Sequence, residues 1–297
     1  MMKEQMKGSI FLLISTMIWG TAFVAQSVGM DYIEPFTFQT TRSFIAVIAL
    51  FPVIWLMEQK KQDGKTFLSR WADPKLWRTG ILCGIALFLA SGLQQVGLVY
   101  TDASKAGFIT AMYIVLVPVL GLFLGQKAGL NIWVSVVLAV AGLYLLSAFG
   151  VSEVNIGDIL LMGCALAFAV QIVLVDRLGQ ELDGLRLNFV QFLVNAVISC
   201  VVMFLFEKPV WQNITACALP LLYTGVLSSG VAFSLQILGQ QRLAPAPASL
   251  IMSLESVFAV IAGWIILGQG LSPTELVGCA LVFAGVILSQ WQPKKSK

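Results

Sequence analysis

Two charged residues lie deep within apolar stretches of this sequence, and both could take part in chemistry there. Glu255 is the only acidic residue in "PASLIMSLESVFAVIAGWIILGQG", and Arg42 lies in "FTFQTTRSFIAVIALF". A charged side chain at the centre of a membrane helix costs roughly 2.5–3.5 kcal/mol, so such residues usually face a cavity or each other. Both residues are therefore candidates for binding a charged molecule.

Each of these two residues has a functional and a structural interpretation. The carboxyl group of Glu255 could exchange its proton for a cationic substrate, or it could be protonated and donate a hydrogen bond to a neighbouring helix. The guanidinium of Arg42 stays charged and could bind a carboxylate through two parallel hydrogen bonds, or pair with Glu255 and hold two helices together. The helical face of Glu255 includes three alanines, which leave room for a cavity or for close helix approach: Ala248, Ala259 and Ala262.

A set of polar and aromatic residues within other apolar stretches completes the candidates. They are Trp19, Gln94, Gln95, Tyr113, Gln171, Gln191, Asn195 and Gln236. Each of them taken singly is typical of an interhelical hydrogen bond, worth about 0.6 kcal/mol on average. Together they are enough to line a polar cavity.

The composition places these residues in a membrane protein. Of the 297 residues, 58% are hydrophobic and 11% are charged, against roughly 45–50% and about 25% in soluble domains. The mean hydropathy is +0.89. The chain has no histidine and five scattered cysteines without a C-x-x-C pair, so we expect no metal site, no cofactor and no enzyme activity. A net charge of +3 gives no indication of nucleic-acid binding.

The apolar stretches predict an all-α integral membrane protein with ten transmembrane helices, because about 20 apolar residues cross the hydrocarbon core. The predicted spans are Ser9 to Val28, Pro35 to Met57, Leu76 to Tyr100, Ala106 to Gly125, Leu130 to Phe149, Ile156 to Val175, Leu187 to Phe206, Cys217 to Leu238, Pro247 to Leu267 and Thr274 to Trp291.

The placement of Lys and Arg predicts the orientation of these spans. With both termini in the cytoplasm, all 18 Lys and Arg residues lie on the cytoplasmic side except Arg42, Lys105 and Lys208. Arg42 then lies roughly 10 Å from the outer end of its span, at about 1.5 Å per residue. The expected location is the cytoplasmic membrane. The first span also has the features of a signal peptide, an alternative that the repeat below disfavours.

The chain contains an internal duplication. A shift of 142–143 residues aligns "LQQVGLVYTDASKAGFITAMYIVLVPVLGLFLGQ" with "LQILGQQRLAPAPASLIMSLESVFAVIAGWIILGQ", and brings Tyr113 approximately onto Glu255. A shift of 149 residues aligns the first span with the sixth. The repeats are predicted as residues 9–149 and 156–291, with five spans each. Because five is odd, the second copy is inverted, a plan that recurs in secondary transporters, although a duplication could also be kept only for packing.

The segments "MIWGTAF", "ASKAGFITAMYIVLVPVLGLFLGQ" and "PASLIMSLESVFAVIAGWIILGQGLS" resemble the EamA-type drug/metabolite transporter superfamily, over nearly the whole chain. The resemblance implies a cavity surrounded by spans 1, 3, 4, 6, 8 and 9. It leaves the substrate open among amino acids, other metabolites, sugars and cationic compounds. The sequence departs from the family pattern at Gln126 and Gln269, where a glutamate is common, and at Ser256, where a proline is common.

The expected function is therefore secondary active transport of a small metabolite or amino acid, most simply as an exporter with proton coupling through Glu255. A lipid translocase and an efflux carrier for cationic compounds are the alternatives. The expected partners are a small-molecule substrate and the lipid bilayer, without nucleic acid. The protein is expected to act as a monomer or homodimer.

Overall fold

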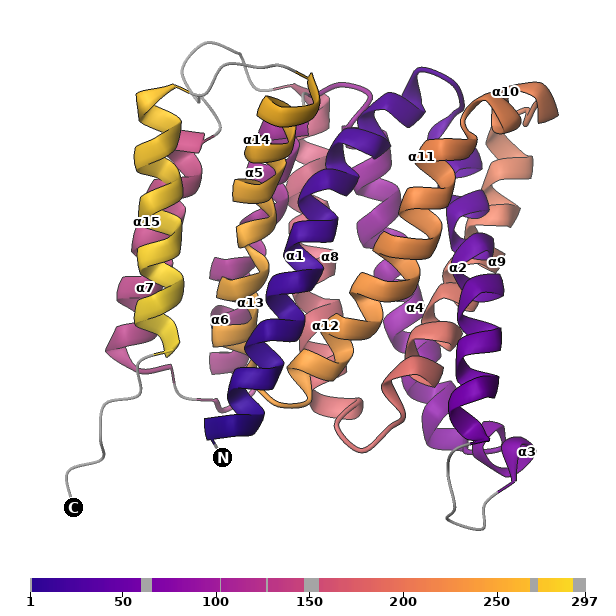
Figure 1. Cartoon of the computed structure of the whole chain (residues 1–297), viewed down its shortest axis with the longest axis horizontal. Helices are drawn as coiled ribbons and strands as arrows, with labels where there is room; N and C mark the ends of the chain where they lie inside the picture. Colours follow the sequence, from indigo (N-terminus) through magenta and orange to yellow (C-terminus); the bar gives the residue numbers. More distant parts are fainter. Residues whose placement is uncertain are drawn as a thin grey trace.

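The computed structural model describes residues 2–59, 66–101, 103–126, 128–146, 155–267 and 272–290, and all regular structure within these ranges is helical. Nine of the described helical segments are long and apolar enough to cross a membrane, and a shorter apolar helix, Leu130–Leu146, occupies the predicted fifth span. The predicted all-α membrane protein of ten helices is confirmed (Figure 1). The predicted ends of spans 5 and 10, at Phe149 and Trp291, lie outside the described residues.

The helices of the first half are α1 (Met2–Met30), α2 (Pro35–Glu58), α3 (Phe67–Trp71), α4 (Pro74–Gly97), α5 (Ala103–Ala111), α6 (Tyr113–Phe123) and α7 (Leu130–Leu146). Those of the second half are α8 (Ile156–Leu178), α9 (Gly184–Phe206), α10 (Trp211–Ala216), α11 (Ala218–Leu222), the π-helix η1 (Tyr223–Ala232), α12 (Phe233–Gln240), α13 (Pro245–Met252), α14 (Leu254–Leu267) and α15 (Pro273–Gln290). Spans 4, 8 and 9 are thus each built from more than one helix, which the sequence reading did not predict.

Helix starts are fixed by residues that suit a first turn. Proline opens α2, α4 and α13, where its missing N–H removes no helical hydrogen bond. Asp73 and Asp183 cap α4 and α9 by accepting backbone N–H groups. At the start of α8, Asn155 and Asp158 form a reciprocal capping box.

The two halves pack around an approximate two-fold relation. Helix α2 packs against α9 and α7 against α15, so each of these helices contacts its own repeat equivalent. The packing of α1 on α14 and α12 has its counterpart in the packing of α8 on α5, α6 and α4. In Figure 1 the start of α1 lies at the same end as the last turn of α15, where Ser9 Oγ donates to Gln290 Oε1 at 3.4 Å.

Individual contacts follow the same relation. A Cβ added to Gly142 would lie 2.6 Å from the carbonyl oxygen of Gly278, and one added to Gly285 would lie 2.7 Å from that of Ser135. These two contacts exchange under the sequence shift of 143 residues. The ends of α2 and α9 are related by the shift of 149 residues. Glu207 accepts from the backbone N–H of Thr37 at 2.6 Å, and its equivalent Glu58 accepts from the side chain of Arg186, the equivalent of Thr37.

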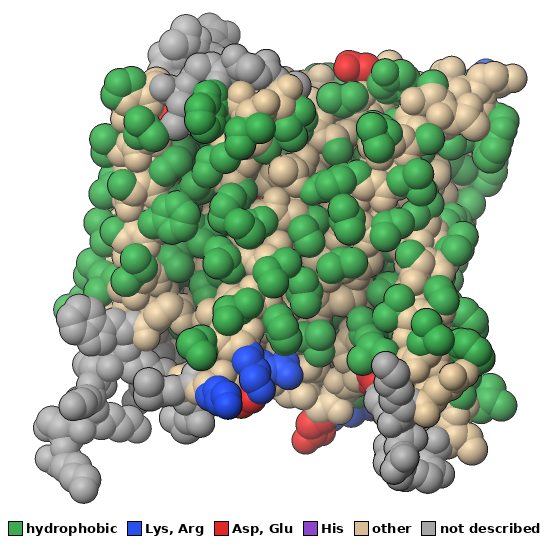
Figure 2. Space-filling model, viewed as in Figure 1, with side chains coloured by type: hydrophobic (Ala, Val, Ile, Leu, Met, Phe, Trp, Pro, Cys, Tyr) green, Lys and Arg blue, Asp and Glu red, His purple; other side chains and the backbone are tan. Residues whose placement is uncertain are grey.

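The outer surface of the bundle is suited to lipid. Large apolar side chains are exposed along its length, among them Ile48, Phe204, Ile265 and Ile287, each with at least two-thirds of its surface accessible. Figure 2 shows hydrophobic side chains over this face, with Lys and Arg gathered at the end where α1 begins. The described basic residues there include Arg242, which pairs with Glu4 at 3.2 Å. The structure is that of a multi-pass membrane protein.

Candidate functional site

Two broken helices meet at the centre of the molecule. Span 4 is interrupted at Met112, between α5 and α6, and span 9 at Ser253, between α13 and α14. Tyr113 follows the first break and Glu255 lies just after the second. The Tyr113 hydroxyl donates to Glu255 Oε1 at 3.0 Å, and both side chains are buried. Residues that are 142 positions apart, and equivalent in the two repeats, therefore touch at the approximate two-fold axis.

The break in span 9 arises without a proline. The hydroxyls of Ser249 and Ser253 donate to carbonyl groups three residues earlier, Ala246 O at 2.9 Å and Leu250 O at 2.8 Å. Such bonds compete with the helical ladder. The backbone N–H of Ser256 then bonds to Ser253 O at 3.2 Å, a tighter turn of the 3₁₀ type. The interruption lies before Glu255, although Ser256 stands where the family often has proline.

Arg42 reaches the same region from α2. Its side chain is 5% exposed, and Nη1 donates to Gln26 Oε1 at 2.7 Å. The Gln26 amide is itself anchored, because its Nε2 donates to Ala22 O at 3.2 Å. Arg42 Nε is buried without a hydrogen-bond partner. Among the described ion pairs none joins Arg42 to Glu255, so the structure does not contain the helix-to-helix pair that the sequence allowed.

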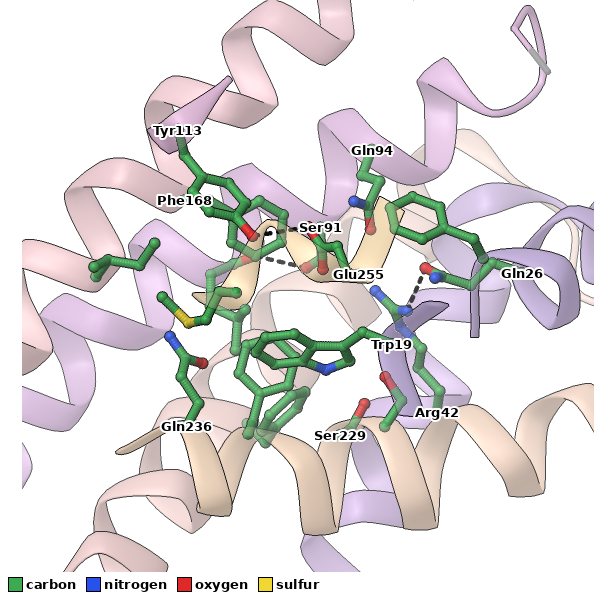
Figure 3. Close-up of a pocket in the computed structure, with 17 residues that line it drawn as sticks. Trp19, Gln26, Arg42, Ser91, Gln94, Tyr113, Phe168, Ser229, Gln236 and Glu255 are labelled. Atoms are coloured by element: carbon green, nitrogen blue, oxygen red, sulfur yellow. Dashed lines mark hydrogen bonds between the residues drawn. The ribbon is translucent and has the colours of Figure 1, made fainter. Parts of the chain in front are cut away.

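Both charged residues line a cavity in the middle of the bundle (Figure 3). Its lining residues come from eight spans and are buried, apart from the half-buried Trp19 and Phe168. They are Trp19, Phe23, Gln26, Arg42, Leu87, Ser91, Gln94, Tyr113, Phe168, Ile172, Phe192, Ser228, Ser229, Phe233, Gln236, Met252 and Glu255. The six spans implied by the family resemblance all contribute, and α2 and α9 contribute as well.

The cavity is small and combines an apolar wall with unsatisfied polar atoms. Its volume of about 50 Å³ corresponds to roughly three or four water molecules. The rings of Trp19 and Phe192 each pack edge-on against Phe233, at centroid distances of 4.9 and 5.1 Å. Three buried polar atoms of lining residues lack a partner in the structure, namely Trp19 Nε1, Arg42 Nε and Gln236 Oε1.

Six of the ten candidates from the sequence line the cavity, and four do not. Glu255, Arg42, Tyr113, Trp19, Gln94 and Gln236 are lining residues. The other four make interhelical contacts away from the cavity wall. Gln95 Nε2 lies 3.1 Å from Met30 Sδ, and Asn195 accepts from Gln39 at 2.8 Å. Gln171 donates to Gln191 at 3.2 Å.

Gln171 and Gln191 belong to a buried amide network on the side of the cavity where the chain begins. Gln236, at the cavity wall, donates to both Gln171 and Gln240, at 3.1 and 3.0 Å. Gln191 donates to Asn188 at 2.8 Å. The network thus ties α8, α9 and α12 together below the cavity, and Gln236 connects it to the lining.

Sequence reasoning missed several lining residues of spans 1 and 8, notably Gln26, Ser228 and Ser229. The two serines lie in the π-helix η1, and π-helical turns are frequent at functional sites. Asn188 Nδ2 donates to the carbonyl groups of Ser229 and Gly230, at 3.0 and 3.1 Å. The run "TGVLSSGVA" with its small residues was the only sequence signal for this irregular stretch.

A buried ion pair closes the bundle on the opposite side of the cavity. Lys105 Nζ of α5 lies 2.7 Å from Asp158 Oδ2 of α8, with both side chains less than one-tenth exposed. Asp158 also accepts from the Thr101 hydroxyl at 3.3 Å and the Asn155 backbone at 3.0 Å. An ionic cluster therefore lies toward one end of the bundle and an amide network toward the other.

Comparison with known proteins gives the family. The model of the EamA-like transporter family matches the chain twice, over residues 6–148 and 155–291. An uncharacterized transporter of Archaeoglobus fulgidus is 32% identical over 286 residues, which cover 96% of this chain and 86% of that protein. The threonine/homoserine exporter RhtA of Escherichia coli is 31% identical over 157 residues, 51% of this chain and 52% of the exporter.

A solved crystal structure shares the fold, with a TM-score of 0.77 at 19% identity, covering 95% of this chain and 96% of that one. The two matches to one family model agree with the duplicated packing described above, and the first relative extends over almost the whole chain. The chain belongs to the EamA-like transporter family and is a multi-pass membrane transporter.

Proposed function

We propose that this chain is a secondary active transporter that exports a small metabolite or amino acid across the cytoplasmic membrane by alternating access. The observation that carries the proposal is the cavity between the two halves, lined by Arg42 and Glu255. Charged residues at this depth are rare in membrane proteins and usually mark substrate or proton pathways.

The two closures support alternating access. The Lys105–Asp158 cluster lies between the cavity and the proposed outer side, and the amide network around Gln236 lies toward the proposed cytoplasmic side. Opening either side means separating only one of them. Inverted repeats provide two packings of similar energy, and breaks in spans 4 and 9 provide points where the halves can bend.

The proposed orientation follows from the basic residues at the end where α1 begins, which is the cytoplasmic end by the positive-inside rule. Export is the proposed direction, because about half of this chain is similar to a threonine/homoserine exporter. We further propose that the two repeats are residues 9–149 and 156–291. The proposed partners are a small-molecule substrate and lipid, with no enzymatic step, in a monomer or homodimer.

Glu255 is the proposed site of proton coupling. It is a buried acidic residue at the cavity wall, and among the described residues Tyr113 is the side chain that donates a hydrogen bond to its carboxyl group. A carboxyl group in this position can hold either a proton or a cationic group of the substrate. The same arrangement, beside the ring of Trp19, favours export of cationic compounds as the second candidate function.

Flux measurements in proteoliposomes test the proposal. Purified protein would be reconstituted with a panel of amino acids, amines and sugars inside, and efflux would be measured with and without an inward proton gradient. We expect at least one small solute to leave faster with the gradient, and Glu255→Gln to abolish this acceleration in a folded protein. Protein-dependent movement of no solute at any pH would overturn the proposed function, and full gradient dependence in Glu255→Gln would remove Glu255 from the coupling.

A further inference from the structure

We infer that the cavity binds a small zwitterion, an amino acid whose carboxylate is held by Arg42 and whose ammonium group is held by Glu255. The inference rests on the proposed function and specifies its substrate class. It makes Arg42 and Glu255 two separate determinants of specificity, one for each charged end of the molecule.

The first observation is that no acidic side chain in the described part of the chain forms an ion pair with the buried guanidinium of Arg42. A guanidinium has five N–H donors and stays protonated. Here one side-chain acceptor, Gln26 Oε1, and one aromatic ring, Phe38 with its centroid 5.8 Å away, are the contacts of its charged group. A buried charge without an anionic partner is strongly unfavourable. A carboxylate bound at the Arg42 guanidinium would supply the missing anion.

The second observation is that the Glu255 carboxyl group has acceptor capacity left over among the described residues. Its Oε1 accepts from Tyr113, and no hydrogen bond to its second oxygen is present. Figure 3 shows the Glu255 carboxyl group and the Arg42 guanidinium directed toward the same space, with Tyr113 on the far side of Glu255 and Gln26 beside Arg42. The cavity therefore offers one cationic and one anionic group that are both available and are not paired with each other.

A zwitterion fits this arrangement better than an ion of either sign. A simple amine would bring a second positive charge toward Arg42, and a simple carboxylate would bring a second negative charge toward Glu255. An amino acid carries its two charged groups close together and is neutral overall. The room of about 50 Å³ favours a small molecule, and the rings of Trp19, Phe192 and Phe233 favour a short apolar side chain.

This placement also gives a mechanism for coupling. When the ammonium group of the substrate leaves Glu255, a proton can take its place on the carboxylate. The proton and the substrate then compete for one group, so each cycle exchanges one proton for one zwitterion. Arg42 keeps its charge throughout and selects the carboxylate in both directions.

The test uses matched ligand sets that differ only in charge: alanine with ethylamine and propanoate, and valine with isobutylamine and isovalerate. Binding to the purified full-length protein would be measured by thermal shift and by competition against efflux in proteoliposomes. We expect a zwitterion to bind at least tenfold more tightly than its amine and its acid. The affinity of Arg42→Gln for the amine should equal its affinity for the zwitterion. The affinity of Glu255→Gln for the acid should likewise equal its affinity for the zwitterion.

Gln95→Leu is the matched control, because Gln95 is a buried glutamine outside the cavity, and it should leave the ligand ratios unchanged. If Arg42→Gln does not fold, Arg42→Lys keeps the charge and should still lose at least tenfold in affinity for the carboxylate. If the unmodified protein binds an amine or an acid as tightly as the matching zwitterion, the proposed substrate class is wrong. Transport of other solutes without amino acid binding would overturn the inference and leave the proposed function standing. Failure to move any solute would overturn both.

Discussion

If the ion pair between Lys105 and Asp158 closes the outer side of the cavity, breaking it should favour opening to that side. We expect Lys105→Met to favour the outward-open conformation. In the closed structure both side chains are less than one-tenth exposed, and Nζ lies 2.7 Å from Oδ2. Removing one partner leaves a buried carboxylate without its cation, while the same carboxylate in an open, hydrated pathway loses much less.

The size of this effect follows from the surroundings of Asp158. Breaking a buried ion pair by removing one partner typically costs about 3–5 kcal/mol. The lower end applies here, because Thr101 and the backbone of Asn155 continue to donate to Asp158. About 3 kcal/mol corresponds to roughly a hundredfold shift of the equilibrium between closed and open forms.

A cysteine at a cavity position reports this shift. Ser229→Cys would be introduced after the five native cysteines are replaced by alanine, and labelled from outside with a membrane-impermeant thiol reagent. We expect Lys105→Met to raise the labelling rate at least tenfold. Lys105→Arg and Lys208→Met should not, because the first keeps the charge and the second changes an exposed lysine of the same end. A labelling rate within twofold of the parent protein, in a variant that melts normally, would refute the assignment of this pair as the outer closure.

Three other predictions follow from single contacts. Tyr113→Phe removes the hydroxyl that donates to Glu255 at 3.0 Å and should slow proton-dependent efflux about tenfold or more, since hydrogen bonds to charged groups are worth about 1.5–3 kcal/mol; unchanged efflux would contradict this. Arg186→Met removes a buried cation that pairs with Glu58 and Asp183. Because Glu58 keeps its ion pair with Arg70, we expect the free energy of unfolding to fall by about 3 kcal/mol, the lower end of the range for a broken buried pair, whereas Arg78→Met, at an exposed position of the same end, should have little effect. Gly142→Leu should lower the melting temperature far more than Gly163→Ala. A Cβ at Gly142 would lie 2.6 Å from the Gly278 carbonyl oxygen, whereas one at Gly163 would lie 3.2 Å from a methyl group of Leu93. Similar melting temperatures of the two variants would refute the close α7–α15 contact.

Much of the architecture could be predicted, because membrane spans appear as apolar stretches and a duplication appears as an alignment of the sequence with itself. The apolar stretches located the ten helices. The shift of 142 residues aligns Tyr113 with Glu255, two residues that contact each other in the structure. The charges alone also identified Arg42 and Glu255 as unusual. These features depend on hydropathy and register, which a single sequence contains.

The details of the cavity could not be predicted, because they depend on how side chains from different spans meet. Gln95, Gln171, Gln191 and Asn195 resemble the lining glutamines in sequence, yet their helices direct them toward other amides or, for Gln95, toward a methionine. The break at Ser253 has a local cause in serine side chains, but serines that bond to the preceding turn are common in unbroken helices. Span 9 also packs against α1 and α5, contacts between distant segments that the local sequence does not specify.

The most direct test of the central claim is the accessibility of one cavity position from both sides of the membrane. In proteoliposomes of known orientation, the cysteine of Ser229→Cys would be labelled with an impermeant reagent from the outer face in one sample and from the inner face in another. Alternating access predicts labelling from each face, slowed from both by a bound amino acid. Labelling from one face only, or no protection by any transported solute, would contradict a cavity that opens in turn to the two sides.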